Sequence, residues 1–314
     1  MKILKTKEFI NEKLNIKPIA KNDKRFAAPK IDKQTESFIK DFELKWNGVT
    51  RCYDSKNDIE VDKRIVKNGK LKLKFGTVDG TFRCDNAQLK SLEGAPKKVS
   101  GSFSCSFNKL TSLEGAPKDI GENFYCNNID TLTSLKGAPI KINKDFYCQH
   151  NALQSLKYVP QTIGGDFSCF GNQINSLEDK PQNLGGDFDC GGNKLSSLKD
   201  APQIVVGDFD CRSNGLESLE GAPKDVGGNF NCNDNMLTSL EGAPKNVGGN
   251  FNCSGNMLTS LEGAPTNVNG DFNCGYNKDL TSIEGVQNVK GDFYCKNCPN
   301  INIPKDTHVK RIIR

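Results

Sequence analysis

The chain has 314 residues, with 43 Lys and Arg against 38 Asp and Glu, for a net charge of +5. A hydrophobic fraction of 35% is low for one globular core of this length, and two histidines leave little for acid–base catalysis near neutral pH, so a conventional enzyme is not expected. No apolar run is long enough to cross a bilayer and the first residues lack a secretory signal, so we expect a protein of the reducing cytoplasm without a membrane span.

The segment 1–56 is basic and predicts a mainly helical N-terminal cap. Residues 1–75 carry 20 Lys and Arg against 11 Asp and Glu, whereas residues 76–303 carry 19 against 26. Two segments place apolar side chains at helical spacing, residues 6–14 and residues 34–46. A stack of repeats must cover the apolar face of its first unit, and we expect these helices to do so.

Residues 57–80 predict a degenerate first repeat. Ile59 and Val61 precede Phe82 and Cys84, the Phe and the Cys of the first regular repeat, and have the same spacing between them. Asn68-Gly69, between two apolar residues, favours a tight turn. We therefore expect this segment to complete the cap.

Residues 81–303 repeat a unit of about 21 residues, a length found in solenoid proteins. Phe recurs at this spacing, with a single longer interval between Phe124 and Phe146, and a Cys follows each Phe by two positions. The Phe residues are Phe82, Phe103, Phe124, Phe146, Phe167, Phe188, Phe209, Phe230, Phe251, Phe272 and Phe293. A fixed period of this length is typical of a repeat solenoid, here with eleven rungs.

Each unit reads Gly-Asp/Asn-Phe-x-Cys-x-x-Asn-x-Leu-x-Ser-Leu-x-Gly-Ala-Pro-x-x-Val-Gly. Phe and Cys are separated by one residue, so both point to one face of a short strand. No unit can bury its apolar side chains alone, so stacked rungs must form the core. We expect the Asn after each Cys to bond the backbone of adjacent rungs, and the Gly-Gly pair to adopt backbone conformations closed to other residues.

The regular pattern ends at residue 303. Cys298, Pro299, Ile301 and Ile303 break the consensus, as a closing cap does. Residues 304–314 form a basic C-terminal tail with 4 Lys and Arg against 1 Asp.

The pattern L-x-x-L followed by F-x-C-x-x-N-x-L resembles a leucine-rich repeat of the short bacterial class, similar to the repeats of type III secreted effectors of enteric pathogens. The words LTSLEGAPKxVGGxFxC and the opening KTKEFINEKLNIKPI look like leucine-rich-repeat proteins of bacteriophages and bacteria. This resemblance implies a right-handed coil with one parallel β-sheet on its concave face. Some effectors add a ubiquitin-ligase domain, but only the short segment 304–314 follows Ile303, so ligase activity is not expected.

The resemblance also implies a non-enzymatic scaffold whose concave face binds another protein. If the chain is encoded by a phage, it implies a host-interaction or counter-defence protein in the host cytoplasm, with a virion-associated adhesin as an alternative. The sequence does not name the partner.

The thirteen cysteines raise the question of disulfides or a metal site. Eleven of them occupy one position of the repeat, where a free Cys packs as a small apolar side chain beside Phe. Cys295-x-x-Cys298 has the spacing of zinc ligands but lacks a second pair. We therefore expect no metal, no cofactor and no catalytic residues.

Six cations near the cap offer an alternative, anion-binding surface. They are Lys63, Arg64, Lys67, Lys70, Lys72 and Lys74. Such a cluster suits nucleic acid or an anionic surface. Interspersed acids and the absence of a nucleic-acid motif favour a solvated cap instead, so nucleic acid is not expected as a partner.

The positions that flank each Phe and follow each Cys are displayed, and two sets of side chains there predict the binding surface. The aromatic set is Phe107, Tyr125, Tyr147, His150 and Phe170, and the acidic set is Asp166, Asp187, Asp189, Asp208 and Asp210. Aromatic anchors beside acids favour a basic segment of a partner protein. Two alternatives stay open: the aromatic side chains fold over the strand edge to cover the core, and the acids are only a solvated strand surface.

Overall fold

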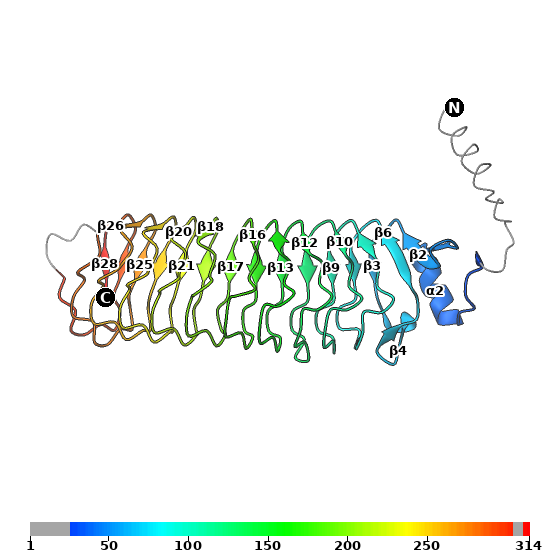
Figure 1. Cartoon of the computed structure of the whole chain (residues 1–314), viewed down its shortest axis with the longest axis horizontal. Coiled ribbons are helices and arrows are strands. Elements are labelled where there is room, and N and C mark those ends of the chain that lie inside the picture. Colours follow the sequence, from blue (N-terminus) through cyan, green and yellow to red (C-terminus); the bar gives the residue numbers. More distant parts are fainter. Residues whose placement is uncertain (1–25, 304–309) are drawn as a thin grey trace, which may run out of the picture.

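The computed structural model describes residues 26–303 and 310–314. It is a β-solenoid in which each turn of the chain adds one short strand to a long parallel sheet, so the predicted repeat solenoid is confirmed (Figure 1). The helix predicted at residues 6–14 and most of the tail predicted at residues 304–314 lie outside the described residues.

One sheet of thirteen strands runs the length of the solenoid. Its strands are β3 (Ile59–Glu60), β7 (Phe82–Arg83), β9 (Phe103–Ser104), β11 (Phe124–Tyr125), β13 (Phe146–Tyr147), β15 (Phe167–Ser168), β17 (Phe188–Asp189), β19 (Phe209–Asp210), β21 (Phe230–Asn231), β23 (Phe251–Asn252), β25 (Phe272–Asn273), β27 (Phe293–Tyr294) and β28 (Ile312–Ile313). From β7 to β27 each Phe lies opposite the next, as Phe188 lies opposite Phe209. The longer turn before β13 keeps this register, with Phe124 opposite Phe146.

The core is a stack of identical layers. In the rung that contains β21, the side chains of Phe230, Cys232, Leu237, Leu240 and Val247 are at most 1% exposed. Successive Phe rings along the sheet lie with their centroids 5.1 to 5.9 Å apart. All thirteen cysteines are free and buried, so the predicted cysteine ladder in the core is confirmed.

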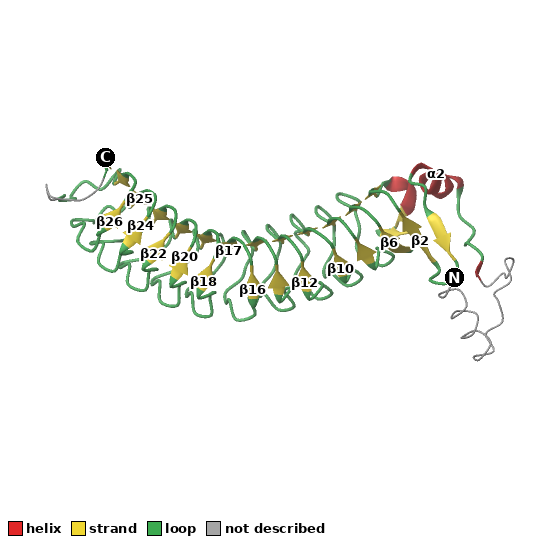
Figure 2. Ribbon diagram, turned by 90° about the horizontal axis from the view of Figure 1, so that it is seen from above, coloured by secondary structure: helices red, strands yellow, loops and turns green. Residues whose placement is uncertain are grey.

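A second line of strands precedes the long sheet at each turn and forms three smaller sheets. They are β1 (Lys45–Asn47), β2 (Cys52–Ser55), β6 (Phe75–Val78), β8 (Lys98–Val99) and β10 (Asp119–Ile120); then β12 (Lys141–Ile142), β14 (Thr162–Ile163) and β16 (Asn183–Leu184); then β18 (Ile204–Val205), β20 (Asp225–Val226), β22 (Asn246–Val247), β24 (Asn267–Val268) and β26 (Asn288–Val289). Figure 2 shows the solenoid as an arc, with β17 and β25 of the long sheet toward its concave side and β18 farther out.

Helix α2 (Lys33–Asp41) covers the N-terminal end of the core, where its Phe38 is fully buried. The helix is shorter than the predicted segment 34–46. Glu43 takes a positive φ of 51°, which turns the chain, and Trp46 then pairs with Tyr53 in the β1–β2 hairpin. The described part of the cap therefore combines one helix with a hairpin.

The first rung of the long sheet begins at β3. Ile59 lies opposite Phe82, the position that the sequence pattern assigns to it. After the short 3-10 helix η2 (Lys63–Ile65), Asn68 and Gly69 form the predicted turn between β4 (Val66–Lys67) and β5 (Lys70–Leu71).

An asparagine ladder follows the cysteine ladder along the bend after the strands. The Nδ2 of Asn235 donates to the carbonyl oxygens of Cys211 and Cys232, both at 3.1 Å. Its Oδ1 accepts from the backbone N–H of Leu216 at 3.2 Å. Asn108 makes the same contacts near the N-terminal end, so the predicted ladder is confirmed.

The Gly-Gly pairs are required for space, and the predicted conformational reason was wrong. Gly227 and Gly228 do not adopt positive φ. A Cβ on Gly227 would lie 2.1 Å from the carbonyl oxygen of Val206, and a Cβ on Gly228 would lie 2.0 Å from Oδ1 of Asp208. At Gly227 and Gly228 the adjacent rung therefore lies too close for a larger residue on this backbone, whereas the equivalent positions of other rungs carry Val206, Asn269 and Glu122.

Candidate functional site

Tyr125 and Tyr147 stack on the outer surface of the long sheet. They lie opposite each other in β11 and β13, with ring centroids 5.4 Å apart and planes inclined by 11°. The Tyr125 hydroxyl accepts from Nδ2 of Asn123 at 2.8 Å, and the Tyr147 hydroxyl donates to Oδ2 of Asp166 at 3.4 Å. Burial and nearby carboxylates, first among them Asp145, raise the pKa of Tyr147. The pair is therefore an aromatic surface whose hydroxyls are held by neighbouring polar side chains.

A second aromatic contact lies beside the first. The rings of His150 and Phe170 meet edge to face with centroids 5.3 Å apart. The guanidinium carbon of Arg212 lies 4.9 Å from the centroid of the Phe170 ring, within the range of a cation–π interaction. Nη1 of Arg212 also donates to Oδ2 of Asp210 at 2.6 Å.

Phe107, the fifth aromatic residue of the predicted set, lies apart from the other four. Its side chain is 54% exposed, and its backbone has a φ of 56°. Among the residues that the structure describes, it contacts no other aromatic ring. Phe107 therefore neither covers the core nor belongs to the aromatic surface.

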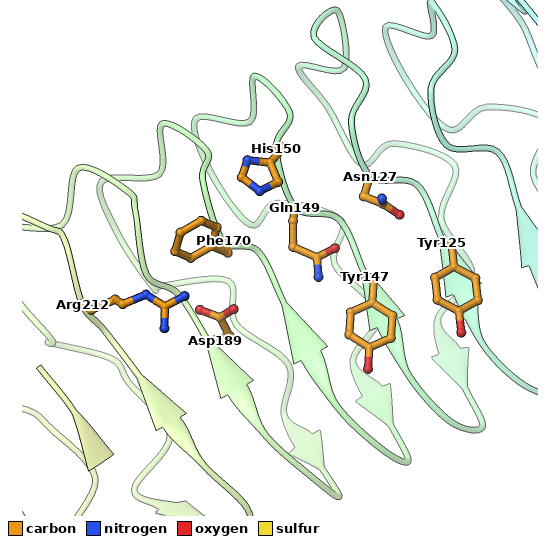
Figure 3. Close-up of a pocket in the computed structure, with 8 residues that line it drawn as sticks. All are labelled: Tyr125, Asn127, Tyr147, Gln149, His150, Phe170, Asp189 and Arg212. Atoms are coloured by element: carbon orange, nitrogen blue, oxygen red, sulfur yellow. The ribbon is translucent and has the colours of Figure 1, made fainter. Parts of the chain in front are cut away.

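The remaining aromatic residues line an open hollow of about 530 Å³ on the concave sheet face (Figure 3). Its lining consists of Tyr125, Asn127, Tyr147, Gln149, His150, Phe170, Asp189 and Arg212. Five of these eight residues belong to the predicted sets. The sequence reasoning missed Asn127, Gln149 and Arg212, although Arg212 stands out at a position that is small or uncharged in most other rungs.

The acids directly before Phe form a hydrogen-bonded column, which we call the Asp/Asn column. Oδ1 of Asp166 accepts from the backbone N–H of Asp187 at 2.9 Å, and Oδ1 of Asp187 accepts from that of Asp208 at 2.7 Å. Equivalent side-chain oxygens make this bond from Asp58 to Asp292. The predicted binding role and its solvated alternative both stay open for this column, and the structure adds that one oxygen of each carboxylate binds the next rung.

Asp189 and Asp210 lie in the strands themselves and are half-buried. Asp210 pairs with Arg212, whereas Asp189 accepts from the backbone N–H of Gly191 at 3.0 Å and from the Ser168 hydroxyl at 2.9 Å. Burial raises the pKa of both carboxyl groups. Asp189 thus accepts hydrogen bonds only from neutral donors, although the positive charge of Arg212 nearby counters part of the rise in its pKa.

The six predicted cations do not form a continuous free basic surface. Three are paired with acids of the same chain: Arg64 with Asp41 and Asp62 and Lys72 with Asp32 within the cap, and Lys70 with Glu93 of the first regular repeat. The other three, Lys63, Lys67 and Lys74, are exposed and have no carboxylate within 4.0 Å among residues 26–303 and 310–314. Half of the predicted cations are therefore paired with acids of the same chain.

Within the described part of the chain, no three His, Cys, Asp or Glu side chains are grouped so that they can hold a metal ion. No helix of that part has the length and apolar character to cross a membrane. In comparisons with known proteins, no family model matches the chain and no curated protein matches it.

Proposed function

We propose that this protein is a non-enzymatic scaffold that binds another protein on the concave face of its long sheet. The main observation in support of this proposal is the hollow around Tyr147. Aromatic rings and an arginine, partly exposed at the centre of a surface of small polar side chains, are the groups that contribute most to protein interfaces. The Asp/Asn column and the asparagine ladder hold the rungs in place before a partner binds, so little conformational entropy is lost on binding.

Side chains must make the contacts with this partner. The strand backbone is already used between rungs: the N–H of Phe146 donates to the carbonyl of Asp166, and that of Cys148 donates to the carbonyl of Ser168. A partner strand therefore cannot pair with the backbone on this face. It has to lie across the sheet and insert side chains into the hollow.

The biological role and the cellular compartment of the protein are part of the same proposal. The resemblance to short leucine-rich repeats supports a binding role, and the words shared with bacteriophage proteins extend it to host interaction or counter-defence. Thirteen buried thiols suit a reducing compartment such as the cytoplasm. Because three of the six cap cations are paired internally, the alternative of an anion-binding cap is less favoured.

Site-directed photo-crosslinking in cells that produce the protein tests this function. A photoreactive residue replaces Gln149 in the hollow, and a second variant carries it at Ile204, which is 70% exposed on β18. We expect one polypeptide to crosslink reproducibly at position 149 and not at position 204, and to bind the purified protein. The same crosslinked proteins at both positions, or none at position 149, would contradict the proposal.

A variant that changes Tyr125 and Tyr147 to Ser separates binding from folding. Both side chains are half-exposed, so we expect the melting temperature to stay close to that of the unchanged protein. Binding of the crosslinked partner should be lost, because the aromatic surface is removed. Undiminished binding by the folded double variant rules this surface out.

A further inference from the structure

At the Arg212 end of the hollow lies one complete set of an aromatic ring, a cation and a carboxylate, although the carboxylate, Asp210, does not itself line the hollow. Arg212 lies over the Phe170 ring and pairs with Asp210. Gly191 stands between Phe170 and Arg212 in the strand register and leaves them room, because a Cβ there would lie 3.1 Å from Phe170 Cδ2 and 3.2 Å from Arg212 Cγ. The surface thus holds its own cation between a ring and a carboxylate.

Tyr147 and Asp189 provide a second aromatic ring and a second carboxylate, at the positions that directly follow Phe146 and Phe188. Ser168 lies between them in the register, opposite Tyr147 on one side and Asp189 on the other. Two strand spacings separate their backbones by about 9.6 Å. Ser168 is small and its hydroxyl is turned to Asp189, so no long side chain stands between the Tyr147 ring and the Asp189 carboxylate, which both line the hollow. Figure 3 shows Tyr147 on one side of the hollow and Asp189 with Arg212 on the other.

Stacking determines which way the Tyr147 ring faces. One face of the ring lies against Tyr125, nearly parallel, with centroids 5.4 Å apart along the solenoid. Its other face is therefore turned along the solenoid toward the rung of Asp189. The electron-rich face of a tyrosine attracts a cation placed over it.

The negative charge of Asp189 also favours a cation in this place. Among the described residues, no Lys, Arg or His nitrogen lies within 4.0 Å of the Asp189 carboxylate. A half-buried carboxylate held only by neutral donors is stabilised when a cation comes beside it. The amide of Gln149, which also lines the hollow, has no hydrogen-bond partner within the described ranges, so its oxygen is available to accept.

We propose that the slot between the Tyr147 ring and the Asp189 carboxylate binds a primary ammonium, the side chain of a lysine in an extended segment of the partner protein. This inference rests on the proposed function. A lysine fits better than an arginine, because each Asp189 oxygen already accepts one hydrogen bond. A compact ammonium can contact both groups, whereas a planar guanidinium needs both oxygens in its own plane.

The test uses the full chain and Nα-acetyl-lysine methylamide as a probe, with binding followed by saturation-transfer NMR. We expect a dissociation constant in the millimolar range. Matched probes with norleucine or with ε-acetylated lysine, which lack the charge, should not bind. The arginine probe should bind at least about threefold more weakly than the lysine probe. Equal binding of the norleucine probe, preferential binding of the arginine probe, or no binding of the lysine probe overturns the inference.

Two substitutions locate the ammonium. Asp189→Asn and Tyr147→Ser should each weaken binding of the lysine probe by about tenfold. The matched controls are Tyr294→Ser, at the equivalent position of β27, and Asp271→Asn, four rungs from Asp189; both should leave it unchanged. Binding that survives in Asp189→Asn assigns the probe to another place and overturns the inference.

The outcome is separable from that of the proposed function. A crosslinked partner at position 149 without lysine-probe binding rejects only the ammonium slot. Lysine-probe binding without a crosslinked partner rejects only the protein-binding role.

Discussion

Arg311 donates to Asp292 at the position where, in every preceding rung of the Asp/Asn column, a backbone N–H donates to the column residue. Nε of Arg311 donates to Oδ1 of Asp292 at 3.0 Å, and Nη2 donates to Oδ2. The adjoining β28 is held by backbone bonds from Phe293 to Arg311 and from Cys295 to Ile313. A side chain near the C-terminal edge thus completes a column that backbone groups build everywhere else.

The first prediction concerns this closing contact. In Arg311→Ala, β28 loses the ion pair that anchors it to the preceding rung, so the amides of Phe293 and Cys295 should exchange with deuterium faster. Amides in the middle of the array, such as that of Phe188, should be unaffected. Lys310→Ala is the control and should leave all three amides unchanged. Equal protection in Arg311→Ala would show that β28 is held without its arginine.

The second prediction separates charge from hydrogen bonding in the Asp/Asn column. Oδ1 of Asp208 accepts from the backbone N–H of Asn229 at 2.7 Å. Asp208→Asn keeps this oxygen and should leave the free energy of unfolding nearly unchanged. Asp208→Ala removes it and should lower that free energy by about 1 kcal/mol. Urea unfolding followed by circular dichroism measures both; equal stability of the Asn and Ala variants contradicts a structural role for the column.

The third prediction concerns the asparagine ladder. Asn235 is buried and serves carbonyl groups of two rungs, so Asn235→Ala leaves buried backbone groups without partners and should lower the free energy of unfolding by about 3 kcal/mol. Asn235→Asp should be at least as destabilising at neutral pH, because a carboxylate then faces two carbonyl oxygens. Urea unfolding at pH 7 tests the order, and an Asp variant as stable as the unchanged protein would refute it.

The fourth prediction is a loss of stability at alkaline pH. Burial raises the pKa of nine ladder thiols, from Cys84 to Cys253. The unfolded chain releases these protons above about pH 8.5 while the folded chain keeps them. The stabilisation is therefore complete below that pH and decreases above it, by up to about 1.4 kcal/mol per pH unit for each thiol. Melting temperatures between pH 7 and pH 10 measure the decrease.

A double variant provides the control for this pH dependence. Cys169→Ala together with Cys190→Ala removes two of the nine buried thiols. The variant should be less stable at pH 7 but should lose stability less steeply above pH 8.5. An unchanged steepness would assign the alkaline transition to groups other than the ladder thiols.

The sequence predicts the interior of this solenoid well and its polar contacts poorly. The spacing of Phe and Cys identifies the buried face of the long-sheet strands β7 to β27, because alternate side chains of a strand point the same way. The interchange of Asp and Asn before Phe suggested a solvated surface, yet both residues share the acceptor oxygen that the next rung uses. The reason for glycine at position 228 was predicted wrongly on similar grounds, because the atom that leaves no room for a side chain there belongs to Asp208 of the neighbouring rung.

The candidate site was predicted in part. Tyr125, Tyr147, His150 and Phe170 stood out because they replace small polar residues, and the structure brings them together. Arg212 was missed because its importance lies in the Phe170 ring two rungs earlier, a contact that the pattern of a single repeat does not reveal. Strand β28 was missed because it follows β27 at an interval shorter than the repeat and carries none of the repeat's residues.

Because each rung is hydrogen-bonded to the rung that follows it in the chain, the solenoid can be completed in order during synthesis. The N–H groups of each Phe in the array and of each ladder Cys donate to the following rung, and Oδ1 of Asp208 and the carbonyl of Cys211 accept from it. On the ribosome the newest rung is therefore always the incomplete one, and the chain that emerges next closes it. At about 5–20 residues per second, a rung is completed roughly every one to four seconds. We expect the protein to grow layer by layer from its N-terminal cap, with each finished layer serving as the template for the next.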